Sequence, residues 1–462
     1  MMKPDPDNIS KYGTHDNNYS NPLHVKDDRD LDNFRSLAGR SIRELANENK
    51  ELLVFPDALG LGAGEDEDAA AFNLESCPDG TSSLVTGNTA GFIGIRRNGH
   101  LTELSIHSRF TDNDDDCFLH YMLQRVFLLN VFDLEHSFSR EDPVFDFLKF
   151  LFPRMLSEAL RQGLYKEYVT KRYDEPVIHG SIDVPSFIGH DIPFMGNISS
   201  VSREHSYDND MTQLVRHTIE VLRRDPVGKS ILEGSREAAL DVAVIERATP
   251  TFRPGACMRV VSSCMRKKPH PYFTSYDPLR RLCLQIIRHE GIRYLSEVNE
   301  DRVFGVLFDV SWLWEEYLGA LLCGFEVDHP ENRKGKGGIQ LFIDSNGYTR
   351  YPDFLSRKRS LVMDAKYKRL GHGASFGRDD IHQMVTYMYM LRAKRGIFLY
   401  PDDSVTELLK IGTLGYGDDG GYPGVVEACS LKIPGSTMKY KDFLLSISKE
   451  EKDFITKLSI GL

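Results

Sequence analysis

The sequence contains no long apolar run and no closely paired cysteines, and its opening does not have the pattern expected of a leader. No stretch of about 18 apolar residues occurs, so the sequence predicts no transmembrane helix and no membrane partner. Its opening, "MMKPDPDNISKYGTHDNNYSN", has no apolar core and does not fit a secretory signal. The seven cysteines are scattered without a C-x-x-C pair, which argues against a zinc ribbon and against a disulfide framework. These absences predict a cytoplasmic protein.

Two common catalytic signatures are also absent. The sequence has no G-x-x-x-x-G-K-[ST] loop, so we expect this chain itself to bind no nucleotide. It has no H-E-x-x-H pattern, which removes the common metalloprotease interpretation. A composition of 41% hydrophobic and 27% charged residues is typical of a globular protein, and 462 residues predict two or three domains.

Basic residues gather in one part of an acidic chain. The net charge is −11, yet residues 331–378 contain eleven Lys or Arg residues against four Asp or Glu residues. A basic segment on an acidic chain is typical of a surface that faces phosphate groups. The overall charge therefore does not exclude a nucleic-acid partner.

The N-terminal part of the chain changes character near residue 41. Residues 1–40 are rich in Asp, Asn and Pro without apolar periodicity, which predicts a disordered acidic tail. The pattern "SIRE" then predicts a helix start with a capping box between Ser41 and Glu44. Two alternating segments joined by Asn98-Gly99 predict a hairpin inside a β-rich unit at about 70–110.

The remainder divides into a helical region and an α/β domain. Residues 111–300 are expected to be mainly helical. Residues 301–462 follow the order helix, three strands, helix, strand, which is typical of a compact domain with a mixed sheet. The expected fold class is α/β, or α+β over the whole chain, with an N-terminal β-rich and helical region before a C-terminal mixed-sheet domain.

Two acids and a lysine share the short basic stretch "YPDFLSRKRSLVMDAKYK". Side chains alternate along a strand, so Asp364 and Lys366 point to the same face, and the turn before them lets Asp353 lie alongside. Carboxylate oxygens suit Mg²⁺, which activates a bound water for phosphodiester hydrolysis. Lys366 could position that water or neutralise the developing anion. A surface hairpin with solvated charges is the alternative interpretation.

Two flanking helices offer further candidates. The segment "WLWEEYLGALL" carries Glu315 and Glu316 on an amphipathic helix that could pack beside the sheet, although both acids could equally cover a solvated face. On the helix after the strand, Gln383 and Tyr387 are four residues apart and share one face. They could reach the site or a DNA backbone.

In their order and spacing, these residues resemble the PD-(D/E)xK nuclease core, in the branch with a Q-x-x-x-Y helix. Longer phrases, among them "FDVSWLWEEYL" and "GFIGI…LSIHSRF", are similar to the McrC family over about residues 85–430. The resemblance implies a nuclease domain at 301–462. It implies Glu315, Asp353 and Asp364 as metal ligands and Lys366 as a further catalytic residue. The implied DNA contacts are Gln383, Tyr387, Arg357, Lys358, Arg359, Lys368 and Arg369.

The same resemblance implies a function. McrC-type chains are endonuclease subunits of restriction systems, which act in antiviral defence, use Mg²⁺ or Mn²⁺ and cut modified double-stranded DNA. They work with an McrB-like AAA+ GTPase hexameric ring, whose GTP hydrolysis they stimulate, and residues 41–300 would dock on that ring. The family phrase RG-x-ID departs here, since His179 replaces its arginine. A non-catalytic adaptor of the ring and a stand-alone DNA-repair nuclease remain alternatives.

Overall fold

The chain forms two compact units, and the second is an insertion in the first. Unit 1 combines Met1–Phe147 with Ser296–Leu462, and unit 2 is Leu148–Leu295. The computed structural model describes residues 9–49, 51–56, 70–77, 81–110, 116–127, 143–224, 226–267, 270–292, 301–330, 337–342, 344, 348–357, 360–370, 376–415, 424–435 and 440–459. Among these residues no helix is long and apolar enough to span a membrane.

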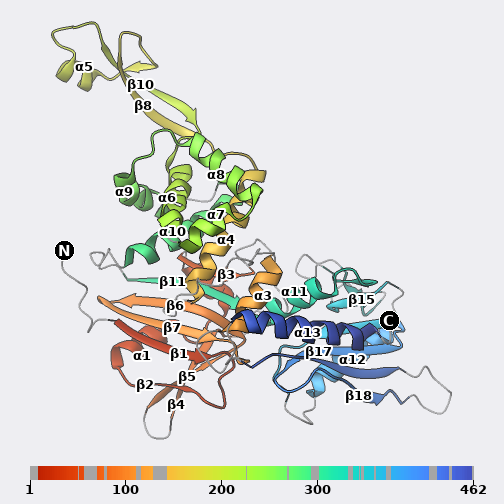
Figure 1. Cartoon of the computed structure of the whole chain (residues 1–462). Coiled ribbons are helices and arrows are strands. Elements are labelled where there is room, and N and C mark those ends of the chain that lie inside the picture. Colours follow the sequence, from red (N-terminus) through yellow and green to blue (C-terminus); the bar gives the residue numbers. More distant parts are fainter. Residues whose placement is uncertain are drawn as a thin grey trace. The chain divides into compact units, whose positions relative to one another are not determined.

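The first half of unit 1 is built on a five-stranded sheet (Figure 1). Its strand order is β1(Ile9–His15), β7(His100–His107), β6(Thr89–Arg97), β11(Arg302–Asp309), β3(Glu51–Phe55). The sheet is accompanied by a three-stranded sheet in the order β2(Leu23–Val25), β5(Ser82–Thr86), β4(Phe72–Ser76), and by helices α1(Asp28–Arg35), α2(Ile42–Glu48) and α3(Cys117–Phe127). The predicted hairpin is confirmed, since Asn98 and Gly99 join β6 to β7 with φ angles of 49° and 79°.

The prediction of a disordered tail over residues 1–40 is wrong for residues 9–40. Strand β1 lies parallel to β7 along its whole length, and Phe34 of α1 is fully buried in the core of this half. The polar residues have buried partners. Asp30 accepts hydrogen bonds from Tyr12 and Thr102, for example. A composition that suggests disorder is here the composition of a buried polar network, which sequence periodicity does not reveal.

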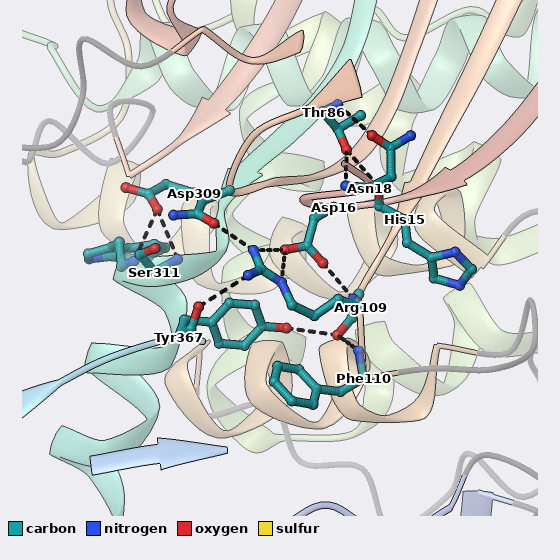
Figure 2. Close-up of polar contacts among 12 residues, drawn as sticks. His15, Asp16, Asn18, Thr86, Arg109, Phe110, Asp309, Ser311 and Tyr367 are labelled. Atoms are coloured by element: carbon teal, nitrogen blue, oxygen red, sulfur yellow. Dashed lines mark hydrogen bonds and ion pairs between the residues drawn. The ribbon is translucent and has the colours of Figure 1, made fainter. Parts of the chain in front are cut away.

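Asp16, which follows β1, holds a buried ion pair with Arg109. Its Oδ1 accepts from the Arg109 backbone N–H at 2.5 Å and its Oδ2 from Nε at 2.7 Å (Figure 2). The side chains of Asp16 and Arg109 are 0% and 9% exposed. Removing one partner of a buried pair leaves the other charge without compensation.

We therefore expect Asp16→Ala to lower the free energy of unfolding by about 3 kcal/mol, the lower end for a broken buried pair, because Arg109 keeps its contact with Asn88. Urea denaturation measures the loss. Asp32→Ala is the control, since Asp32 pairs with Arg35 with both side chains more than half exposed, and it should change stability little. Equal stability of the two variants would contradict the prediction.

The expected boundary at residues 300/301 is also wrong. Strand β11, placed in the C-terminal domain by the sequence, pairs antiparallel with β6 and parallel with β3 inside the N-terminal sheet. The strand runs directly into α11(Val310–Leu322), whose N-cap Asp309 accepts hydrogen bonds from Ser311 and Trp312. One continuous segment thus supplies both a strand of the N-terminal sheet, β11, and the first helix of the C-terminal half, α11.

The C-terminal half of unit 1 has the mixed sheet that the sequence predicts. Its order is β12(Val327–Asp328), β15(Phe354–Ser356), β16(Leu361–Ala365), β17(Arg395–Asp402), β19(Val425–Lys432), β18(Leu408–Thr413). The β16–β17 and β17–β19 pairs are parallel and the others antiparallel. A short pair β13(Ile339–Gln340) and β14(Thr349–Arg350), and helices α12(Arg378–Leu391) and α13(Tyr440–Ser459), complete this half.

Unit 2 combines a helical body with a β arm. The body contains α4(Pro143–Arg161), α6(Asp210–Arg224), α7(Pro226–Glu233), α8(Arg236–Ala248), a short 3₁₀ helix (Pro254–Ala256), α9(Cys257–Met265) and α10(Tyr276–Ile292). The arm is an antiparallel ribbon of β8(Glu167–Glu175) and β10(Ile198–Ser206), with β9(Ser181–Ile182) and α5(Val184–His190) at its end (Figure 1). The expectation that residues 111–300 are mainly helical therefore holds for the body and is wrong for the arm.

Candidate functional site

The two predicted aspartates face each other at the end of the β15–β16 hairpin. Phe354 pairs with Met363, which brings the adjoining Asp353 and Asp364 opposite each other. The Oδ2 atom of Asp353 accepts a hydrogen bond from the Ala365 backbone N–H at 2.7 Å. Asp364 is 2% exposed. The structure therefore brings the acids together as the alternation of the strand predicts.

Lys366, two positions after Asp364, also contacts this pair of acids. Its Nζ lies 2.8 Å from Asp364 Oδ2 and donates to Gln383 Oε1 at 3.0 Å. Asp380, in the first turn of α12, lies 3.8 Å from the same nitrogen and 2.6 Å from Lys368 Nζ. The ammonium group is thus held between residues of β16 and α12.

Helix α12 reaches the site because it packs closely on β17. A Cβ atom at Gly396 would come within 2.6 Å of the sulfur atoms of Met384 and Met388, so glycine permits this approach. Gln383 Nε2 donates to the Tyr387 hydroxyl, which donates to the Tyr351 carbonyl. Tyr387 is 1% exposed and its hydroxyl supports Gln383; its contact with DNA stays a prediction.

Helix α11 supplies the third acid. Trp314, fully buried, donates its indole N–H to the Leu399 carbonyl of β17 and so fixes the helix against the sheet. The charge of the next residue, Glu315, raises the pKa of Asp353. Of the two helix acids, Glu315 is thus the one whose charge affects the pKa of Asp353; its role as a metal ligand stays a prediction.

His329 lies beside these acids and was not predicted. Its Nδ1 is 2.9 Å from the Asp353 carbonyl oxygen and 3.9 Å from Glu315 Oε1, and its Nε2 is 3.8 Å from Glu316. Burial lowers the pKa of His329, but its contact with Glu316, its hydrogen bond with the Asp353 carbonyl and the charge of Glu315 outweigh burial and raise it to about 8. At neutral pH a positive imidazolium thus offsets part of the negative charge around Asp353.

The acids are electrostatically crowded. Burial raises the pKa of Asp353 well above its ordinary value, and the charges of Glu315 and Asp364 raise it further. Burial also raises the pKa of Asp364, although the charge of Lys366 opposes this shift. Asp364 Oδ2 contacts Lys366 as an ion pair without hydrogen-bond geometry, so this buried oxygen has no hydrogen-bond donor among the described residues. Such a cluster favours a bound cation.

The other predicted DNA contacts lie around the site with their charges partly engaged. Arg357 is 3.6 Å from Asp328, and Arg369 is 2.8 Å from Asp403. The side chains of Lys368 and Arg369 are about half exposed, at 46% and 49%. Lys358 and Arg359 lie outside the described residues. The structure is compatible with phosphate contacts by the exposed members of this group.

Sequence reasoning missed His329 and Asp380. Asp380 carries a weak local signal, since it falls at the N-terminus of a predicted helix, where acids are common for electrostatic reasons alone. His329 follows a two-residue strand and forms no motif with its neighbours. Its role depends on contacts with residues 14 and 24 positions away, for which no sequence pattern exists.

The chain is similar to proteins of one restriction system. The family model described as "McrBC 5-methylcytosine restriction system component" matches residues 84–401. No curated protein matches. A structure of Thermococcus gammatolerans McrB AAA+ hexamers with bound McrC is similar over 98% of this chain and 100% of that chain, with 14% identity and a TM-score of 0.48. A structure of the Thermococcus gammatolerans McrBC complex is similar over 68% of this chain and 87% of that chain, with 15% identity and a TM-score of 0.29.

The family assignment depends on the family model, which spans more than half of the 462 residues and includes Glu315, Asp353, Asp364, Lys366 and Gln383. The matched segment begins within β5 of the three-stranded sheet, contains all of unit 2 and ends within β17 of the mixed sheet. The chain therefore belongs to the family of McrBC 5-methylcytosine restriction system components.

Proposed function

We propose that the chain is the Mg²⁺-dependent DNA endonuclease subunit of an McrBC-like restriction complex. One observation carries the proposal: Asp353, Asp364 and Lys366 converge at the end of one hairpin. The charge of Glu315 on α11 raises the pKa of Asp353, and Gln383 on α12 holds the lysine. The arrangement fits the PD-(D/E)xK nuclease pattern. A solvated surface hairpin does not account for it, because Asp364 is 2% exposed.

The residues fit a divalent cation. Among the described residues, no three His, Cys, Asp or Glu side chains are grouped so that they alone could hold a metal ion in a protein cage. Mg²⁺ needs no such cage, because it keeps several waters and usually binds one or two carboxylates together with substrate phosphates. The crowded acids Asp353 and Asp364, and the buried Asp364 oxygen without a hydrogen-bond donor, supply the negative charge that it requires. Mn²⁺ suits the same oxygen ligands.

The chain's own residues then have separate roles. When bound, the metal supplies a water with a lowered pKa and stabilises charge on the phosphate. Asp353 and Asp364 would hold it, with Glu315 completing its surroundings. Lys366, held by Asp364 and Gln383, places a positive charge where the scissile phosphate gains negative charge. Gln383 and Tyr387 keep Lys366 oriented through their hydrogen-bond chain to the Tyr351 carbonyl.

We further propose that the partner is an McrB-like AAA+ GTPase hexameric ring and that unit 2 docks on it. The family assignment supports a multi-component system. The end of the unit 2 arm exposes a group of apolar side chains, each 46–87% exposed: Val177, Ile178, Ile182, Val184, Ile188, Ile192, Phe194 and Met195. A group of this size on one protrusion is typical of a protein-binding surface.

We expect the chain alone to leave plasmid DNA nearly uncut in Mg²⁺. It has no nucleotide motif, and its basic segment is modest against a net charge of −11. Adding the ring and GTP should produce cleavage, which is followed by gel electrophoresis of modified plasmid. Robust cutting by the chain alone would favour a stand-alone repair nuclease. Stimulated GTP hydrolysis without any cutting would favour the non-catalytic adaptor.

A further inference from the structure

Tyr367, the residue after Lys366, is buried in a contact with the N-terminal sheet. Strand β16 ends at Ala365, and the Lys366 backbone N–H still donates to the Leu399 carbonyl at 2.8 Å. Beyond that bond the chain leaves the sheet. Tyr367 is 3% exposed. The position of the Lys366 side chain therefore depends on what holds Tyr367.

Three consecutive residues directly after β7 hold it. Ser108 Oγ lies 2.7 Å from the Tyr367 hydroxyl. The Arg109 guanidinium carbon lies 5.0 Å from the centre of the tyrosine ring, and its Nη1 donates to the Tyr367 carbonyl at 3.4 Å (Figure 2). The Phe110 ring packs edge-on at 5.2 Å between centroids. These contacts fix the backbone, the ring and the hydroxyl of one residue.

The N-terminal side of this contact is itself fixed. Arg109 is bound by Asp16 and donates to Asn88 Oδ1 at 2.5 Å, and the Ser108 backbone N–H donates to Asp116 Oδ2 at 2.9 Å. Asp16 and Asp116 are 1% and 3% exposed. Asp16 follows β1 and Asp116 precedes α3. Two further segments of the chain therefore hold the residues that contact Tyr367.

We infer that Tyr367 is a positioning residue for Lys366, held in place by Ser108 and Arg109. The Lys366 carbonyl accepts from the Lys368 backbone N–H at 3.0 Å across Tyr367. Fixing Tyr367 therefore fixes this tight turn and with it the direction in which the Lys366 side chain leaves the backbone towards Asp364 and Gln383. A catalytic group displaced by about 1 Å costs up to ~10²-fold in rate. This inference deepens the proposed function and rests on it.

The simpler alternative is that the Ser108–Tyr367 hydrogen bond only stabilises the fold. Tyr121 offers a matched control within unit 1. It is 7% exposed, and its hydroxyl donates to Glu451 Oε1 at 2.8 Å. Tyr121→Phe should lower the melting temperature about as much as Tyr367→Phe and leave the cleavage rate unchanged. A purely structural role predicts the same behaviour for both variants.

The experiment measures the single-turnover rate of DNA cleavage by the chain with its ring, GTP and Mg²⁺, well below the melting temperature. Tyr367→Phe and Ser108→Ala should each lower the rate on the order of 10-fold, with DNA affinity unchanged. Because both remove the same hydrogen bond, the double variant should be no slower than either single variant. A wild-type rate for Tyr367→Phe, or an equal loss for Tyr121→Phe, would overturn the inference.

Hydrogen–deuterium exchange separates this inference from the proposed function. In the chain alone, the peptide covering residues 361–370 should exchange faster in Tyr367→Phe than in wild type, and Tyr121→Phe should not change it. If the wild-type complex cuts no DNA, the proposed function fails and the exchange experiment alone decides about the positioning contact. Unchanged exchange in Tyr367→Phe would then refute that contact.

Discussion

Asp364→Ala should reduce DNA cleavage by at least ~10²-fold, the usual cost of removing a preorganised charge at a reacting centre. Asp364 is the most buried of the three acids, and its Oδ2 is buried without a hydrogen-bond donor among the described residues. Removing it takes away one proposed metal ligand and one of the groups that hold Lys366. The loss is measured as the rate of plasmid cleavage by the complex with GTP and Mg²⁺.

The variant should fold normally. Asp364 raises the pKa of Asp353, so its removal relieves repulsion between buried acids, while Lys366 keeps its contacts with Gln383 and Asp380. Melting temperature and stimulation of GTP hydrolysis report folding and ring binding. Asp379→Ala is the matched control, because this carboxylate is 95% exposed on α12 in the same half of unit 1. Cleavage at the wild-type rate by Asp364→Ala would exclude the proposed site.

Replacing Phe194 and Met195 by aspartate should abolish most of the stimulation of the ring's GTP hydrolysis. These side chains are 61% and 87% exposed at the end of the unit 2 arm. Burying such a side chain contributes about 1.5–3 kcal/mol, so losing two of them should weaken binding by about 10²-fold or more. The measurement is the concentration of this chain that gives half-maximal GTP turnover.

Leu240→Asp provides the control for this experiment. Leu240 is 58% exposed on α8, in the body of unit 2, and lies outside the apolar group of the arm. It should leave the stimulation unchanged. An equal loss in both variants would attribute the effect to solubility, and wild-type stimulation by the Phe194/Met195 variant would refute docking by the arm. A fragment that ends near residue 300 would test docking less well than these full-chain variants, because it lacks β11, which lies between β6 and β3 in the sheet.

The sequence by itself determined the features that depend on neighbouring residues. The Asn98-Gly99 turn, the Ser41–Glu44 capping box and the mixed sheet of the C-terminal half are all confirmed. So is the convergence of Asp353, Asp364 and Lys366, because strand alternation and one short turn suffice to bring them together. In each case the geometry follows from a few consecutive residues.

Only the tertiary structure decided the features that depend on distant partners. The N-terminal segment folds because β1 pairs with β7, about 90 positions away, and Asp16 pairs with Arg109. Likewise, β11 pairs with β6 although all of unit 2 lies between them in the sequence, and Tyr367 forms a hydrogen bond with Ser108. A polar or single aromatic residue has no periodicity that identifies such a partner. Its burial becomes favourable only when the fold supplies the matching donor, acceptor or ring.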